Sequence, residues 1–132
     1  MYEQDYIMRL IREMVRMLLK LLFHMDLSTP AAELLKEAES RETLDILLDL
    51  VDNGDINEAE NRVYELISDG SMQSLQVALF FYACLNDKTD DFLEENGFSR
   101  KEIKEDLEDI VSRYGLSGLS GVFLEDTSFP ET

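Results

Sequence analysis

Apolar residues recur at helical spacing along most of this chain, and no other feature limits the possible folds as strongly. In the first 25 residues the spacing alternates between three and four positions, at Met8, Ile11, Val15, Leu18, Leu22 and Met25. Such spacing places apolar side chains on one face of an α-helix. No segment alternates apolar and polar residues over six positions, as a half-buried strand would, and only two prolines occur. The sequence therefore predicts an all-α fold with no sheet.

Signals that start and stop helices divide the chain into about six helices, which we expect to form a compact bundle. We expect helices over residues 2–24, 29–39, 42–52, 55–68, 72–85 and 99–115, with a further short turn of helix over 88–95. Residues 39–42 hold no apolar side chain, so we predict a break there, with one long bent helix as the alternative. Ile7, Met14 and Leu21 are expected to widen the apolar seam of the first helix.

Two of the expected helices carry especially clear signals. The segment 72–85 is apolar on almost every side. A helix without a polar face is normally buried at the centre of its domain. The last helix has the clearest start, because Ser99 and Glu102 have the spacing of a capping box while Phe98 and Ile103 hold the two staple positions around it.

Charge is distributed unevenly along the chain. Its 132 residues include 29 acidic and 12 basic ones, for a formal net charge of −17, and the first 26 hold four of each. So acidic a chain lacks the clustered Lys and Arg that release counterions from phosphates, which excludes a general nucleic-acid binder. We expect one domain, residues 1–132. It comprises a neutral amphipathic helix (1–26), an acidic helical body (27–115) and a Gly- and Ser-rich tail (116–132) that docks on the body.

Four basic residues of the first helix share a narrow face opposite its apolar seam: Arg9, Arg12, Arg16 and Lys20. A basic amphipathic helix suits a partner protein or an anionic membrane. We do not expect membrane binding, because an anionic surface would repel the acidic body. We predict that this basic face contacts an unknown protein partner or mediates self-association. The sequence supports at least as well a basic face that is solvated or that faces the acidic body of its own chain or of a dimer mate.

Residues 47–67 resemble one helical hairpin of a tetratricopeptide repeat. In that family a Gly-Asp-aromatic-x-Glu-Ala run opens the second helix, and four positions match it here: Gly54, Asp55, Glu58 and Ala59. Ile56 replaces the aromatic residue, and Asp55 and Glu58 also have capping-box spacing. The pattern does not return about 34 residues later, so the resemblance implies a single hairpin rather than a solenoid. The groove of this hairpin is a second candidate surface for a protein partner.

The same turn also matches part of a calcium-binding EF-hand loop. Six residues have suitable types for their positions in such a loop: Asp49, Asn53, Gly54, Ile56, Asn57 and Glu60. Val51 occupies the third position, where an oxygen ligand is needed, and it completes the apolar stripe of its helix. We therefore expect a plain turn rather than a calcium site.

Acidic clusters and the lone His24 and Cys84 are the remaining candidates for chemistry. The clusters, at residues 37–42, 87–95 and 102–109, lie on polar helix faces, and we expect them to be solvated rather than to bind a divalent metal. His24 and Cys84 have the residue types of a nucleophile and its base, but no third group orients them. A thiol within an apolar segment is ordinarily inert. We therefore expect no catalytic residue, metal or cofactor.

The first helix does not have the pattern of a signal peptide. Its four bases interrupt the apolar residues about once per turn, whereas a signal peptide needs an unbroken apolar stretch of about 7–15 residues. A single cysteine excludes an internal disulfide framework and is compatible with a reducing compartment. We expect a cytoplasmic protein.

Taken with the hairpin and the acidic body, the opening residues 1–16 resemble a small bacterial family of unknown function. Members of that kind are short, all-helical, cytoplasmic proteins, and the resemblance implies no activity. From the residues we predict a non-enzymatic protein–protein interaction module that uses the basic N-terminal helix or the hairpin groove. The alternatives are a helical homodimer with a structural role and a small metal-dependent enzyme that uses surface carboxylates.

Overall fold

The computed structural model describes residues 2–25 and 37–116. Within these ranges the chain forms six helices and no strand. The helices are α1 (Tyr2–Phe23), α3 (Ala38–Asp52), α4 (Ile56–Ile67), α5 (Met72–Asn86), α6 (Asp90–Glu95) and α7 (Arg100–Arg113). The predicted all-α bundle without a sheet is confirmed. The expected helix over 29–39 and the expected docking tail lie almost wholly outside the described residues.

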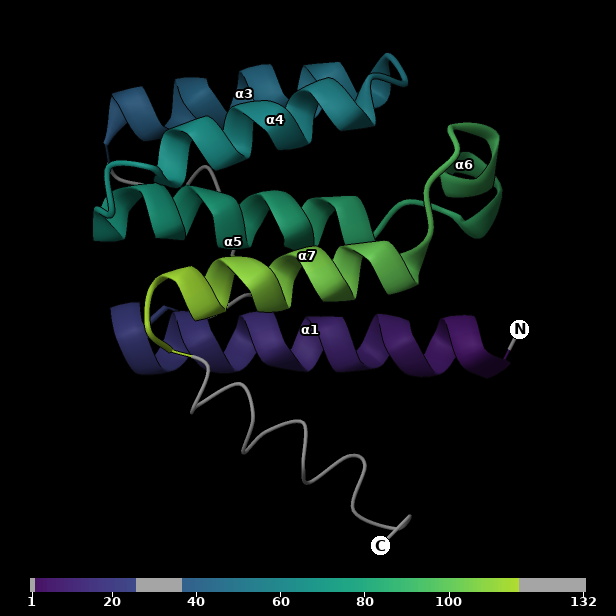
Figure 1. Ribbon diagram of the computed structural model, residues 1–132, viewed down its shortest axis with the longest axis horizontal. Coiled ribbons are helices and arrows are strands. Elements are labelled where there is room, and N and C mark those ends of the chain that lie inside the picture. Colours follow the sequence, from purple (N-terminus) through teal and green to yellow (C-terminus); the bar gives the residue numbers. More distant parts are fainter. Residues whose placement is uncertain (1, 26–36, 117–132) are drawn as a thin grey trace, which may run out of the picture.

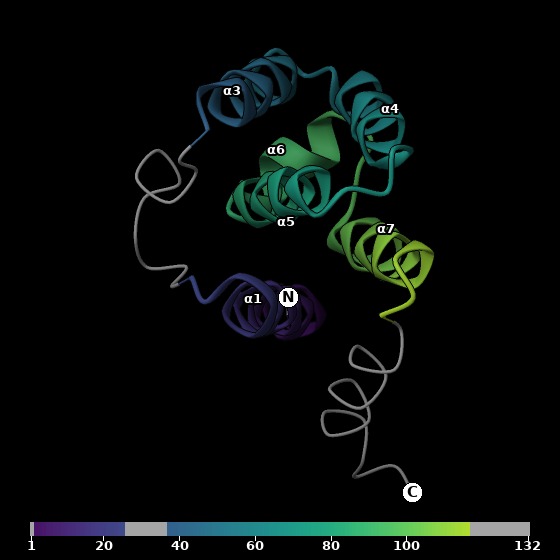
Figure 2. The same cartoon turned by 90° about the vertical axis from the view of Figure 1, so that its left-hand side faces the viewer.

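Helix α5 is the centre of the bundle (Figures 1 and 2). It packs against α1 and α7 on one side and against α3 and α4 on the other, while α6 lies at one end. Eight of its apolar residues are buried: Leu75, Val77, Ala78, Leu79, Phe80, Phe81, Tyr82 and Leu85. The prediction from the apolar segment is confirmed, because neighbours on every side leave no face for polar residues.

Helix α1 is part of the core, with Ile11, Val15 and Leu19 fully buried. It runs antiparallel to α5, since the Asn86 side chain donates to the Met8 carbonyl at one end and Gln76 contacts Met25 at the other. The expectation that Leu21 widens the buried seam is wrong, because this side chain is 52% exposed. Helix α5 lies on the flank that carries Met8 and Leu19, which turns Leu21 toward solvent.

The predicted break at residues 39–42 is also wrong. Helix α3 is continuous from Ala38 to Asp52, and the extended backbone lies earlier, at Glu37 (φ −83°, ψ 127°). The first turn of a helix needs no apolar stripe when it faces solvent, and an acidic residue there, Glu39, suits the positive end of the helix dipole. The polar residues 39–42 therefore belong to the start of α3.

The turn between α3 and α4 depends on Gly54. Its φ of +89° favours glycine, and a Cβ there would lie 2.7 Å from Oδ1 of Asn96. The expected capping box before α4 does not form, because the Asp55 side chain accepts no capping hydrogen bond. The main hydrogen bond of the capping box predicted before α7 is confirmed. In it, the amide of Glu102 donates to the Ser99 hydroxyl at 3.2 Å.

Candidate functional site

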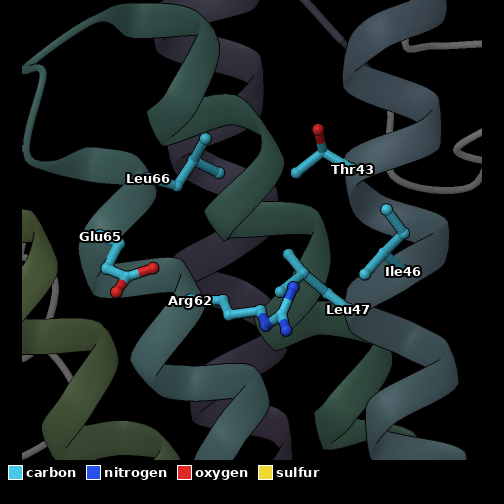
Figure 3. Close-up of a pocket in the computed structure, with 6 residues that line it drawn as sticks. All are labelled: Thr43, Ile46, Leu47, Arg62, Glu65 and Leu66. Atoms are coloured by element: carbon cyan, nitrogen blue, oxygen red, sulfur yellow. The ribbon is translucent and has the colours of Figure 1, made fainter.

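An open groove runs between α3 and α4 (Figure 3). Side chains from the two helices face one another across it: Thr43, Ile46 and Leu47 from α3, and Arg62, Glu65 and Leu66 from α4. The groove encloses a cavity of about 360 Å³. Leu47 closes its floor and is buried, whereas Ile46 on the rim is 51% exposed. The predicted hairpin therefore has an accessible apolar surface along its seam.

The groove continues into a smaller cavity of about 150 Å³ that shares Thr43 and Leu66 with it. Acidic residues Glu39 and Asp69 line this end. The amide of Ser71 donates to the Asp69 carboxylate at 2.8 Å, which holds the pKa of Asp69 below its ordinary value. This end of the groove is negatively charged, while the main cavity combines apolar side chains with Arg62 and Glu65.

The four predicted basic residues lie on the outer face of α1, and all are exposed. Arg12 forms an ion pair at 3.3 Å with Asp87, the C-cap residue of α5, and Arg16 binds Glu13 of its own helix. Arg9 and Lys20 form no hydrogen bond or ion pair with the described residues. Arg12 thus contacts the acidic body of its own chain. A role of this basic face in partner binding stays a prediction.

The residues of the calcium hypothesis do not converge on the turn. Asp49 lies in the last turns of α3, and Glu60 lies on the inward face of α4, 9% exposed. The Glu60 carboxylate accepts a hydrogen bond from the Tyr82 hydroxyl at 2.8 Å instead of facing residues 53–57. Across residues 2–25 and 37–116, no group of three or more His, Cys, Asp or Glu side chains is placed to hold a metal ion.

His24 and Cys84 lie at opposite ends of the α1–α5 pair. Cys84 is near Asp87, which binds Arg12, and His24 lies just beyond the end of α1, twelve residues after Arg12. At 1.5 Å per residue this separation is about 18 Å. Burial raises the pKa of the Cys84 thiol, the opposite of an activated nucleophile. The structure does not bring this pair together.

The sequence did not predict the buried polar cluster that lies between α4, α5 and α7. Burial, followed by a hydrogen bond with Asp106, raises the pKa of Glu60 to about 8. Burial and a hydrogen bond to Asp109 raise the pKa of Tyr64. A signal for Glu60 was present, since it occupies the apolar stripe of α4 between Ile56 and Val63. A carboxylate at such a position needs a buried partner.

Arg100 is a second buried charge that sequence reasoning missed. It is 3% exposed and donates to the backbone carbonyls of Asn86 and Lys88, at 2.5 and 2.6 Å, and to Asp90 at 3.1 Å. The carbonyls at the end of a helix lack partners within that helix. Arg100 satisfies them at the end of α5 and so fixes the start of α7, which is a structural role.

The fold defines an all-α bundle wrapped around a buried central helix, with one open helical hairpin at its edge. The chain belongs to a family of unknown function, DUF6483, which matches residues 1–115. This range takes in all six described helices, the groove and the buried cluster. Searches of curated proteins and of solved structures return no match. Among the described helices, none has the length and apolar character needed to cross a bilayer.

Proposed function

We propose that this protein is a non-enzymatic interaction module that binds a segment of a partner protein in the groove between α3 and α4. The observation behind this proposal is the exposed apolar seam of the hairpin, where Ile46 is 51% exposed beside Leu66. Covering apolar surface is favourable by about 25 cal/mol per Å². An amphipathic partner helix suits a groove between two helices, because its apolar side chains fill the seam.

The charges around the groove define the chemistry of the partner. Glu39 and Asp69 lie at one end, and the lowered pKa of Asp69 keeps this carboxylate ionised. A basic residue at one end of the partner's apolar stripe would meet these carboxylates. The occupant we propose is therefore an amphipathic helix with a basic end, from another protein.

The groove is a better candidate than α1. The apolar face of α1 is already packed against α5 and α7, which leaves Arg9, Arg12, Arg16 and Lys20 on an exposed outer face, and none of the four lines either cavity of the groove. The catalytic alternative has less support, because the groups with the most strongly raised pKa values, Glu60 and Tyr82, line neither cavity. The resemblance of the opening residues supports a bacterial, cytoplasmic protein, and Gly54, Asp55, Glu58 and Ala59 support a tetratricopeptide-like hairpin.

Site-specific photo-crosslinking in living cells tests this proposal. A photoreactive amino acid replaces Ile46 on the groove rim, and the matched control carries it at Glu105, an exposed position of α7. We expect an adduct with another protein at position 46 and none at position 105. The absence of an adduct at position 46, or the same adducts at both positions, would overturn the proposal. An adduct with a second copy of this chain would replace it with the homodimer alternative.

A further inference from the structure

The groove between α3 and α4 changes in chemistry along its length. Glu39 and Asp69 line the small cavity at its acidic end. Apolar side chains follow, among them Leu66, which lines both cavities, and Ile46 on the rim. Arg62 lies farther from the acidic end, four residues before Leu66 on α4, or about 6 Å along the helix axis. An occupant that enters at the acidic end therefore meets carboxylates, then apolar side chains, then a cation.

Arg62 supplies the positive charge of the groove. Its side chain extends toward α3, whereas Glu65 lies between it and the acidic end on α4 (Figure 3). The Nε atom of Arg62 donates to Glu58 at 3.2 Å. A guanidinium has two further nitrogens that can donate. Arg62 can therefore bind a carboxylate of an occupant while it keeps its bond to Glu58.

Helix α7 ends beside the acidic end of the groove. The Tyr114 hydroxyl donates to the backbone carbonyl of Ser71 at 2.7 Å, and Ser71 lines the small cavity. Figure 1 shows the end of α7 and the start of α5 at the same end of the bundle. Leu116 packs against the core two residues after Tyr114. The tail (116–132), of which residues 117–132 lie outside the described residues, therefore starts close to the groove.

The tail is long enough to follow the groove from this starting point. The two cavities together extend along α3 from Glu39 to Leu47, which is about 12 Å at the helical rise of 1.5 Å per residue. An extended chain covers up to about 3.3 Å per residue, so residues 117–126 can span about 33 Å. This length covers the distance from the end of α7 as well as the groove itself.

The order of residue types in the tail complements the order in the groove. Residues 117–121 carry no charge, residues 122–124 are Val, Phe and Leu, and residues 125–126 are Glu and Asp. From the acidic end onward, the uncharged stretch passes the carboxylates, the apolar stretch reaches the apolar centre, and the acidic pair reaches Arg62. Burial of the apolar stretch is favourable, and a guanidinium binds carboxylates by charge-assisted hydrogen bonds.

We propose that the tail occupies the groove of its own chain through residues 117–126 and competes there with the partner protein. The occupancy stands on the sequence and starting point of the tail, whereas the competition rests on the proposed function. The tail holds no basic residue, so it cannot pair with Glu39 and Asp69. A partner helix with a basic end gains these contacts and displaces the tail.

Photo-crosslinking of the purified full chain tests the occupancy. The photoreactive amino acid again replaces Ile46, with Glu105 as the control position, and the chain is digested for mass spectrometry after irradiation. We expect a crosslink from position 46 to residues 117–126 and none to them from position 105. A mixture of ¹⁵N-labelled and unlabelled chains shows whether the crosslink lies within one chain. No crosslink to residues 117–126, or one that joins two chains, would overturn the proposal.

Charge variants test the contact with Arg62. Glu125→Gln combined with Asp126→Asn should lower the crosslink yield at position 46 about two- to fivefold, the range expected for an exposed ion pair. Arg62→Gln should lower it by a similar factor, and all three changes together should lower it no further. Glu131→Gln, which removes a tail charge outside residues 117–126, should leave the yield unchanged. An equal loss in Glu131→Gln, or losses that multiply, would overturn this contact.

The same tail variant in living cells separates the competition from the proposed function. With the photoreactive amino acid at position 46, Glu125→Gln combined with Asp126→Asn should raise the adduct with another protein about two- to fivefold. A partner adduct that does not change would overturn the competition and leave the partner in place. An intrachain crosslink without any partner adduct, with either tail, would overturn the proposed function and the competition but not the occupancy.

Discussion

Helix α4 faces α3 on one flank and α7 on the other. The charged side chains on these two flanks differ in how far they are exposed to solvent. On the groove flank Arg62 pairs with Glu58, and both side chains are about half exposed, at 51% and 52%. On the α7 flank Glu60 is buried among tyrosines and other carboxyl groups. The residue types are ordinary for a helix on both flanks. Solvent access decides whether a carboxylate is a plain surface charge or a buried group with a raised pKa.

The largest effect should come from a carboxylate in the same apolar stripe without the partners of Glu60. Val63 is fully buried one turn from Glu60. Val63→Asp should destabilise the protein by about 3–5 kcal/mol at pH 7, because an unpaired buried charge is left uncompensated. Urea unfolding measures the loss, with Asn61→Asp, exposed on the same helix, as the control. Equal free energies of unfolding for the two variants would show that burial does not determine the cost of a carboxylate on this helix.

A smaller effect is expected from the hydroxyl that binds Glu60. Tyr82→Phe removes the 2.8 Å hydrogen bond without changing the ring, and should cost about 1–2 kcal/mol. Because this bond favours the ionised carboxylate, its loss should raise the pKa of Glu60 further and move its NMR midpoint to higher pH. Tyr64→Phe, on the more exposed edge of the cluster, should cost less. A midpoint that falls in Tyr82→Phe contradicts this account.

The fold was predictable where a single helix carries the signal. The all-apolar character of α5 correctly predicted its central place, and Ser99 and Phe98 correctly predicted the start of α7. The error at Leu21 lies where a neighbouring helix decides. Leu21 and Leu19 are both apolar residues of α1, and only the position of α5 makes Leu19 part of the core.

The candidate site was predictable in outline but not in its chemistry. The hairpin groove followed from the turn at Gly54 and two apolar stripes. The buried cluster did not, since its members come from three helices far apart in sequence: Glu60, Tyr82 and Asp106. The sequence marked Glu60 as a polar residue within an apolar stripe. Its partner could be found only once α7 was placed beside α4.

The smallest effect is expected on the groove flank. Arg62→Gln removes the ion pair with Glu58, an exposed i, i+4 pair at 3.2 Å, and should cost only about 0.3–0.5 kcal/mol in urea unfolding. In 1 M NaCl this cost should vanish, since the screening length falls to about 3 Å. The cost of Tyr82→Phe should persist in the same salt, because its bond to Glu60 is shielded from solvent. A salt-resistant loss in Arg62→Gln would mean that the two flanks of α4 do not differ in the way proposed.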